Sequence, residues 1–315
     1  MAEIRGKPIP FCFSLARKLV YSKVKAELGL DQAKHFLFGA APMAAQTREY
    51  FLSLNIFLKN AYGMSECSGP QTFTVPSVIS KFDNETLISC GKAMEGTDLI
   101  LHEVDKEGNG ELCYKGRNRF MGYYKNEEET KNTVDDQGFL HSGDVGKLDK
   151  HGNVSITGRI KELIITAGGE NVAPVLIEDQ IKEELPFISN AMVVGDKRKY
   201  LVILLTLRLA LDKDGKPSEQ LSNDGLKFIK DMGSHAKTLS DAVKDEKILK
   251  AIDEGIKKAN DKSISRAQHI RKWAIIPGDF TVDGGELTPT LKLKRKFTSS
   301  KHAEAILKLY QDPKL

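Results

Sequence analysis

The N-terminal part of the chain alternates between helical and strand-like patterns of apolar residues. Ser14–Leu28 carries apolar residues at positions 15, 19, 20, 24 and 28, a helical spacing that ends at Gly29. His35–Phe38 is a short apolar run that ends in a glycine, Ala44–Leu54 is a second helical stretch, and Ile56–Tyr62 is a second apolar run. Short apolar runs of this kind are typical of buried strands, so the pattern predicts two buried strands with a helix between them.

Between Gly69 and Gly158 the apolar runs are shorter and closer together. Glycine-containing turns at 107–110 and 149–153 separate several of them, and one acidic helical segment, Glu127–Val134, interrupts the series. Short strands with tight turns between them predict antiparallel hairpins. The expected strands are Thr72–Val75, Leu87–Cys90, Asp98–Glu103, Glu111–Tyr114, Val145–Leu148 and Val154–Thr157.

A new unit is expected after Gly158. Residues 210–268 are polar and helical in pattern, with little strand signal. The other expected elements are a strand at Leu163–Thr166, a helix at Pro174–Glu184, two paired strands at Ala191–Val194 and Leu201–Leu207, a strand at Trp273–Pro277 and a helix at Ser299–Tyr310. This mixture of strands and helices predicts an α/β fold.

Composition narrows the class of protein. A length of 315 residues gives room for about two domains, and 40% hydrophobic with 29% charged residues is an ordinary globular composition. The net charge of +4 is too small to indicate nucleic-acid binding. No signal peptide and no transmembrane segment are expected, because the longest strongly apolar stretch is only Leu201–Leu207. The four cysteines have no metal-binding spacing, which indicates reduced thiols in the cytoplasm.

Two carboxylates follow or precede predicted strands in glycine-containing segments. Glu66 ends the segment Tyr62-Gly-Met-Ser-Glu66, and a carboxylate just after a strand suits Mg²⁺ at the ligand edge of an α/β sheet. Asp144 ends the segment His141-Ser-Gly-Asp144, where both carboxylate oxygens could accept the hydroxyls of a ribose. The alternatives are an exposed loop glutamate for Glu66 and an ordinary Asx turn for Asp144.

The second half of the chain carries two further clusters. Arg159 could hold phosphate or ribose oxygens in its planar fork, and the Gly168-Gly169 pair lets a narrow ligand pass close to the backbone. In the segment 288–296, Lys292, Lys294 and Lys296 would point to the same side if the backbone is extended. The alternatives are a structural turn for the glycines and a solvated basic face for the lysines.

Taken in order, these segments resemble a known family. Five segments resemble the second half of adenylate-forming, AMP-binding enzymes of the acyl-CoA synthetase type. The segments are GAAPM, YGMSE, HSGDVG, GRIKELIITAGGENVAP and LTPTLKLKR. The similarity is greatest to long-chain fatty-acid–CoA ligases of the bubblegum group, and it covers the chain from about Tyr21 to Tyr310.

The resemblance implies a nucleotide site in the first half of the chain. Gly39-Ala40-Ala41 and Tyr62 match residues that line the adenine pocket, and Glu66 matches a glutamate associated with Mg²⁺. Asp144 matches the ribose-binding aspartate, and Arg159 matches an arginine that contacts ribose and phosphate.

The resemblance also implies a mobile second domain. Lys161 falls at the hinge between the domains, Gly168-Gly169 matches a loop along the path of CoA, and Lys292 matches the mobile lysine of the adenylation step. The implied domains are 1–158, the C-terminal portion of the large AMP-binding domain with a parallel sheet and a β-rich subdomain, and 159–315, a small α+β domain.

The implied function is that of a ligase that joins a long-chain fatty acid to CoA through an acyl-adenylate, with ATP, Mg²⁺ and CoA. The implied location is the cytoplasm. Peripheral association with the surface of the endoplasmic reticulum or another intracellular membrane is compatible with the resemblance. An acyl-AMP ligase without the CoA step is disfavoured, because Gly168–Pro174 resembles the CoA-using group.

One departure from the family pattern leaves a second hypothesis. The glycine-rich phosphate loop of the family has no counterpart in residues 1–38, and Met1–Phe13 does not match the family. The alternative is therefore a truncated, catalytically inactive chain that serves as a nucleotide-binding or protein-interaction module.

Overall fold

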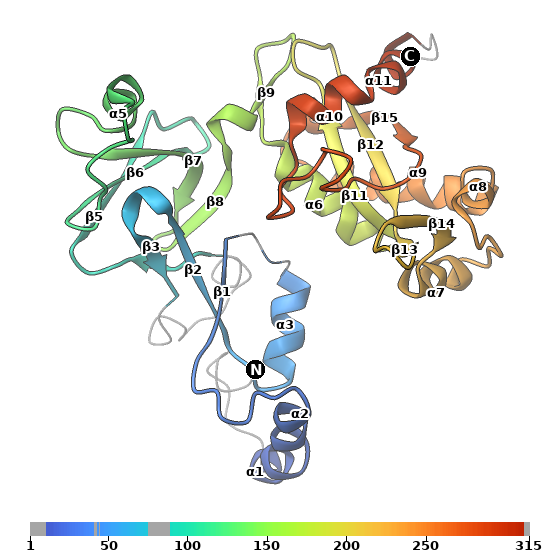
Figure 1. Ribbon diagram of the computed structural model, residues 1–315, viewed down its shortest axis with the longest axis horizontal. Helices are drawn as coiled ribbons and strands as arrows, with labels where there is room; N and C mark the ends of the chain where they lie inside the picture. The colour runs from blue at the N-terminus through green and yellow to red at the C-terminus, as the bar shows by residue number, and fades with distance from the viewer. Residues whose placement is uncertain (1–10, 41–42, 44, 75–88, 312–315) are drawn as a thin grey trace. The chain divides into compact units, whose positions relative to one another are not determined.

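The computed structural model describes residues 11–40, 43, 45–74 and 89–311 (Figure 1). The chain divides into two compact units, unit 1 (Met1–Ile160) and unit 2 (Lys161–Leu315), and the division falls just after Gly158, where the sequence pattern changes. In the part of the chain that the structure describes, no helix has the length and apolar character needed to cross a membrane.

Unit 1 begins with a parallel strand pair and its helices. The elements are α1 (Phe13–Ala16), the π-helical turn η1 (Arg17–Tyr21), α2 (Ser22–Glu27), β1 (Phe36–Gly39), α3 (Ala45–Ser53), β2 (Leu58–Met64), η2 (Ser65–Cys67), β3 (Gly69–Phe73) and β4 (Lys92–Ala93). The four strands form one sheet in the order β1-β2-β3-β4, in which β1 and β2 are parallel. The predicted helix–strand alternation in this part is confirmed.

The predicted burial of the first strand is wrong. Leu37, in β1, is 58% exposed, and the strand alternates between half-buried and exposed side chains. The reason is that β1 lies at the end of the sheet and bonds to β2 alone among the described strands. Half of the predicted strand Leu87–Cys90 lies outside the described residues, and the other half, Ser89 and Cys90, is not in a strand.

The second sheet of unit 1 is an antiparallel meander, as the turn signals predicted. Its elements are β5 (Thr97–His102), β6 (Gly110–Gly116), α5 (Glu127–Thr133), β7 (Leu140–Leu148) and β8 (Val154–Arg159). Asp105 closes the first turn, because its Oδ1 accepts the N–H groups of Glu107 and Asn109. β7 begins five residues earlier than predicted, so His141–Asp144 lies inside the strand and not in a turn before it.

Unit 2 is built around a three-stranded sheet. The strands are β11 (Ile188–Val194), β12 (Leu201–Leu207) and β15 (Ile270–Ile275), and the flanking elements are η4 (Ile160–Glu162), β9 (Ile164–Ile165), β10 (Asn171–Val172), α6 (Pro174–Glu184), η5 (Arg266–Gln268), α10 (Arg295–Lys301) and α11 (Ala303–Gln311). β12 is buried along its whole length and bonds antiparallel to β11 and parallel to β15. The predicted pairing of β11 with β12 is therefore confirmed.

Two predictions for unit 2 need correction. The polar region 210–268 contains a hairpin besides its helices, because Asp212 Oδ1 accepts the N–H groups of Asp214 and Lys216 and closes a tight turn. The last helix is two helices, α10 and α11, with His302 between them. The elements of the polar region are β13 (Leu209–Leu211), β14 (Pro217–Leu221), α7 (Asn223–Asp231), α8 (Leu239–Ala242) and α9 (Glu246–Asp261).

The two units differ in the size of their hydrophobic cores. The core of unit 2 extends from Ile164 to Ile270 and includes residues of β11, β12, α6 and α9. In the described part of unit 1, the fully packed cluster is small and comprises Cys90, Leu112, Tyr114 and Val154. A unit that buries more apolar contacts unfolds locally less often and is therefore cleaved more slowly by proteases.

We therefore expect limited proteolysis of residues 1–315 to leave a fragment that begins near Lys161 and includes α9. Mass spectrometry of the digestion products over time measures this. A fragment from within residues 1–160 that outlasts all fragments of unit 2 would contradict the expectation.

Candidate functional site

Three strands of unit 1 bring Tyr62, Asp144 and Arg159 together. The hydroxyl of Tyr62, on β2, donates to Asp144 Oδ2 at 2.5 Å, and Arg159 Nε, at the end of β8, donates to Asp144 Oδ1 at 2.7 Å. The Asp144 side chain is 11% exposed, whereas that of Arg159 is 50% exposed. Each oxygen of the buried carboxylate thus accepts one hydrogen bond and keeps further acceptor capacity.

The environment keeps Tyr62 in its neutral, donating form. Burial raises the pKa of the Tyr62 hydroxyl above its ordinary range, and the neighbouring Tyr114 and Asp144 raise it further. The rings of Tyr62 and Tyr114 lie 6.1 Å apart, and Tyr114 belongs to the buried cluster of unit 1. Tyr62 therefore serves as a fixed hydrogen-bond donor to Asp144.

The carboxyl end of β1 lies next to the strand β2 that carries Tyr62. Gly39 is paired with Ala61, directly before Tyr62, and a Cβ on Gly39 would come within 2.4 Å of the Ala61 carbonyl oxygen. A larger residue would push β1 away from β2, so this close approach requires glycine. Ala40 has a positive φ of 66°, which turns the chain sharply at the carboxyl end of the strand. Ala41 lies outside the described residues.

Glu66 lies just past the carboxyl end of β2, as predicted. It belongs to the short turn η2, its Oε1 accepts the hydroxyl of Tyr123 at 2.9 Å, and its backbone oxygen accepts the N–H of Phe120 at 2.6 Å. The carboxylate is half-buried and is held by the loop before α5. Sequence reasoning did not identify Tyr123, because no local pattern relates it to a residue 57 positions earlier.

Three predicted site residues lie near the start of unit 2. Lys161 is an exposed residue of η4, directly after the division between the units. Gly168 and Gly169 lie in the tight turn between β9 and β10, where the Gly169 N–H donates to the Thr166 oxygen and the φ of Gly169 is +80°. A Cβ on Gly169 would meet nothing within 4 Å, so the turn leaves open space beside the backbone.

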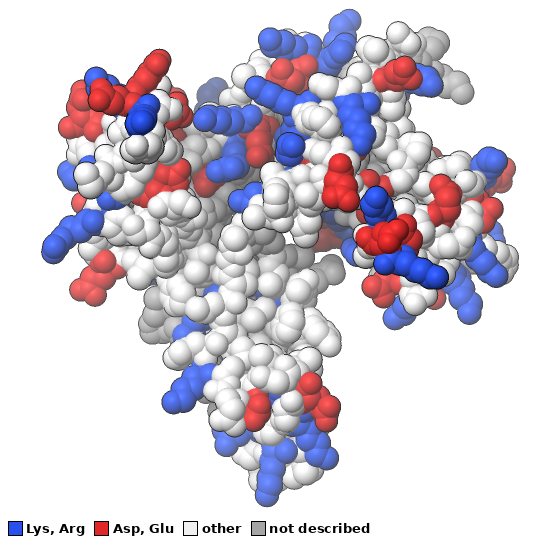
Figure 2. Space-filling view, viewed as in Figure 1, with Lys and Arg blue, Asp and Glu red and all other residues white. Residues whose placement is uncertain are grey.

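The segment around Lys292 is a tight loop and not an extended strand, so the predicted alternation of three lysines is wrong. The N–H of Lys292 donates to Thr288 Oγ1, and the Thr288 N–H donates to the Lys292 oxygen. Lys294 precedes α10 and Lys296 lies inside it. The loop closes because the threonine forms both bonds, and it presents Lys292 on an exposed tip. Figure 2 shows lysine and arginine side chains gathered over the part of unit 2 that contains α10 and β9.

A buried ion pair holds the base of this loop. The two terminal nitrogens of Arg295 donate to the two carboxylate oxygens of Glu178, each at 2.6 Å, and Arg295 Nε lies 3.5 Å from Glu162 Oε2. Burial lowers the pKa of Arg295, but the hydrogen bonds and charges of Glu178 and Glu162 raise it above its ordinary value. Glu178 Oε1 also accepts the N–H of Val193. The arginine thus joins α10 to α6 and to η4.

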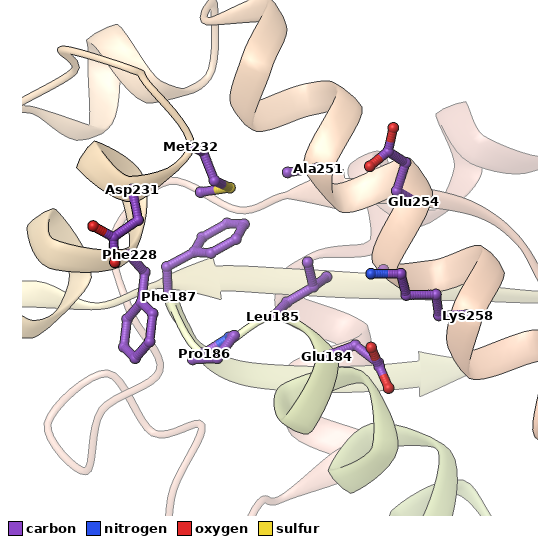
Figure 3. Close-up of a pocket in the computed structure, with 11 residues that line it drawn as sticks. Glu184, Leu185, Pro186, Phe187, Phe228, Asp231, Met232, Ala251, Glu254 and Lys258 are labelled. Atoms are coloured by element: carbon purple, nitrogen blue, oxygen red, sulfur yellow. The ribbon is translucent and has the colours of Figure 1, made fainter.

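Unit 2 also contains a pocket of about 350 Å³ away from these residues (Figure 3). Leu185, Phe187 and Met232 form its apolar wall, and Glu184 and Lys258 are among the charged residues at its edge. None of the lining residues was predicted from the sequence to belong to the functional site.

Comparison with known proteins matches part of each unit to a family model of AMP-binding enzymes. Residues 12–124 match the family model of the AMP-binding enzyme, and residues 161–244 match the model of the AMP-binding enzyme C-terminal domain. The chain is 47% identical to long-chain-fatty-acid–CoA ligase ACSBG2 of Gallus gallus over 96% of this chain and 39% of the relative. It is 46% identical to ACSBG1 of Homo sapiens over 97% of this chain and 42% of the relative.

Solved structures show the same fold. The adenylation domain of a carboxylate reductase from Mycobacterium chelonae aligns with a TM-score of 0.66 and 21% identity, over 99% of this chain and 44% of that one. The o-succinylbenzoate CoA synthetase of Bacillus subtilis, in complex with an acyl-adenylate intermediate, aligns with a TM-score of 0.61 and 18% identity, over 87% of this chain and 49% of that one. The chain therefore spans less than half the length of each of these relatives, and both of its units contain AMP-binding enzyme domains.

Proposed function

We propose that this chain is part of an ATP-dependent long-chain fatty-acid–CoA ligase. In the proposed reaction, the fatty-acid carboxylate attacks the α-phosphate of ATP, and pyrophosphate leaves. The thiol of CoA then attacks the acyl carbon of the acyl-adenylate, and AMP leaves as the thioester forms. The identity of 45–47% to relatives that carry this name supports the proposal. Neither step needs a protein nucleophile, so the residues bind, orient and stabilise charge.

The observation that carries the proposal is the buried Asp144 between Tyr62 and Arg159. An ionised carboxylate fixed by two donors can accept both hydroxyls of a ribose without moving, because each oxygen has a second lone pair. Arg159, which is half exposed, is proposed to contact ribose or phosphate oxygens. Gly39, Ala40 and Tyr62 are proposed to line the adenine pocket at the carboxyl ends of β1 and β2, where α/β sheets bind ligands. Ala41, outside the described residues, is assigned to the same pocket from the sequence resemblance alone.

Glu66 fits the Mg²⁺ ion that accompanies ATP. Its carboxylate offers hard oxygen ligands, and the hydrogen bond from Tyr123 orients the group through one oxygen. Bound Mg²⁺ would offset the negative charge of the phosphate groups during displacement of pyrophosphate. In the proposed site, Glu66 holds this ion near the ligand edge of the sheet.

Unit 2 is proposed to supply the groups that change between the two steps. Lys292, on its exposed loop, would stabilise the phosphate charge during adenylation. Lys161 would be the hinge about which unit 2 rotates, and the Gly168-Gly169 turn would line the path of CoA, since open space lies beside its backbone. We place the enzyme in the cytoplasm, with peripheral contact to membranes such as the endoplasmic reticulum, because long-chain fatty acids partition into membranes.

Asp144→Ala tests the ribose assignment. In the natural protein that contains residues 1–315, the variant is expected to raise the KM for ATP roughly 10- to 150-fold, because charge-assisted hydrogen bonds worth about 1.5–3 kcal/mol are lost. The KM for oleate is expected to stay unchanged. Release of pyrophosphate, measured with oleate in the presence and absence of CoA, provides both constants.

The control for this experiment is Asp98→Ala, which removes an exposed aspartate from β5. It is expected to leave both constants at their wild-type values. A raised KM for oleate with an unchanged KM for ATP in Asp144→Ala would contradict the ribose role. Absence of oleate-dependent pyrophosphate release from the natural protein would contradict the ligase proposal itself.

A further inference from the structure

A second carboxylate, Glu111, contacts the strand segment that carries Asp144. Glu111 lies on β6, and its Oε1 accepts the backbone N–H of Gly143 at 2.9 Å. Its Oε2 lies 2.7 Å from His141 Nδ1, so one carboxylate bonds to two residues of the same segment. The side chain of Glu111 is 12% exposed. The nucleotide chemistry described above uses neither Glu111 nor His141.

The contact occurs where the ladder between β6 and β7 is irregular. Glu111 pairs with Val145 and Cys113 pairs with His141, so Leu112 alone faces the three residues 142–144. The extra residues form a bulge, in which Gly143 has a φ of +70°. A bulged N–H has no partner in the strand ladder, and a buried N–H without a partner is costly. The Glu111 carboxylate supplies that partner.

The bulge determines where Asp144 points. Gly143 directly precedes Asp144, and the N–H of Asp144 donates to Ser142 Oγ at 3.0 Å. The two successive N–H groups that lead into Asp144 are thus both held by side chains, one by Glu111 and one by Ser142. A bulge of this kind changes the direction of a side chain on a strand. Without Glu111, the segment loses the bond that selects this backbone conformation.

Glu111, Cys113 and His141 also resemble a set of metal ligands, since their donor atoms all lie within 4.8 Å of one another. The distances favour hydrogen bonding instead. Two ligands at about 2.0–2.1 Å from one tetrahedral zinc ion are about 3.4 Å apart, whereas the nitrogen and oxygen here are 2.7 Å apart. Burial also raises the pKa of the Cys113 thiol to about 12, with Glu111 and Asp135 adding to the shift, so Cys113 is a neutral thiol beside this hydrogen bond.

We propose that Glu111 is a positioning residue for the nucleotide: it holds the bulge at Gly143 and thereby aims the Asp144 carboxylate at the ribose hydroxyls. His141 supports Glu111 from the other side, because its Nε2 lies 3.6 Å from Asp135 Oδ2 and its Nδ1 faces Glu111. The inference rests on the proposed ribose role of Asp144. It adds a residue that acts through the backbone and does not touch the nucleotide.

The test compares ATP with 2′,3′-dideoxy-ATP in the pyrophosphate-release assay of the natural protein. The wild-type enzyme is expected to prefer ATP, because only ATP carries the ribose diol. Glu111→Ala is expected to lower the ratio of kcat/KM for ATP to kcat/KM for the dideoxy analogue about tenfold. Glu111→Gln keeps an oxygen that can accept from Gly143 and is expected to keep the ratio within about threefold of wild type. Glu107→Gln, which changes an exposed glutamate in the turn before β6, is the matched control.

Asp144→Ala, measured in parallel, separates the two proposals. If Asp144→Ala leaves the preference for ATP unchanged, the ribose role of Asp144 is wrong. If Asp144→Ala abolishes the preference but Glu111→Ala retains it, the role of Glu111 is wrong. Should Glu111→Ala fail to fold, Glu111→Asp replaces it, because the shorter carboxylate cannot reach both Gly143 and His141. A wild-type ratio in Glu111→Asp would then overturn the proposal.

Discussion

Lys292→Ala is expected to lower the rate of acyl-adenylate formation about a hundredfold or more. A preorganised donor that meets developing charge on a transferring group is worth on the order of 3 kcal/mol. Lys292 suits this task because the bonds between its backbone and Thr288 fix the tip of the loop while its side chain remains exposed. Formation of the thioester from preformed acyl-adenylate is expected to stay near the wild-type rate.

The two half-reactions of Lys292→Ala are measured separately in the natural protein, by pyrophosphate release and by thioester formation from synthetic oleoyl-adenylate. Lys296→Ala is the control, because it removes the same charge from an exposed position in α10. It is expected to leave both rates within about twofold of wild type. Equal losses of both half-reactions in Lys292→Ala would argue against its role in adenylation and for general damage.

Arg295→Met is expected to destabilise the protein by about 3–5 kcal/mol, because it leaves the buried Glu178 carboxylate without its cation. Glu178 is 5% exposed and its Oε1 still accepts the Val193 N–H, so the negative charge cannot turn out to water without losing that bond. Urea unfolding of residues 1–315, followed by the fluorescence of Trp273 in unit 2, measures the change.

The double variant Arg295→Met with Glu178→Gln tests whether the unpaired charge of Glu178 causes the loss of stability. It removes both charges and keeps an oxygen for the Val193 N–H, so most of the lost stability is expected to return. Lys301→Met is the single-variant control for loss of a positive charge in α10, because Lys301 is half-exposed and its partner Glu286 keeps His302 as a neighbour. It is expected to cost less than Arg295→Met. A double variant less stable than Arg295→Met alone would contradict the assignment.

Much of the architecture could be predicted from local patterns. The helix Pro174–Glu184 was predicted with its observed bounds, because proline at the first helical position and the apolar spacing are both local signals. The pairing of β11 with β12 was also predictable, since a strand with almost only apolar residues is buried on both faces inside a sheet and therefore has neighbouring strands. The hairpin β13–β14 was missed because β13 has only three residues and β14 is mostly polar.

In the candidate site, too, the local motifs could be predicted from the sequence, whereas the distant contacts could not. Tyr62, Glu66 and Asp144 can be identified from the sequence, because each lies in a short segment that also contains glycine. Their partners do not stand out: Tyr123 lies 57 residues from Glu66, and Glu111 lies 32 residues from Gly143. Hydrophobic periodicity indicates which face of a strand is buried, but it does not indicate which distant polar group completes a hydrogen bond.

The amino-acid sequence by itself determined most of the order of helices and strands, the change of pattern after Gly158, and the residues that we propose bind a nucleotide. Only the tertiary structure decided that β7 continues through the segment His141–Asp144, that Glu111 partners the bulge there, and that Arg295 meets Glu178 across 117 residues. The reason is physical. Local conformation follows from the side chains within a few positions, whereas the partner of a buried polar group is selected by whichever strand or helix the completed fold brings within hydrogen-bonding distance.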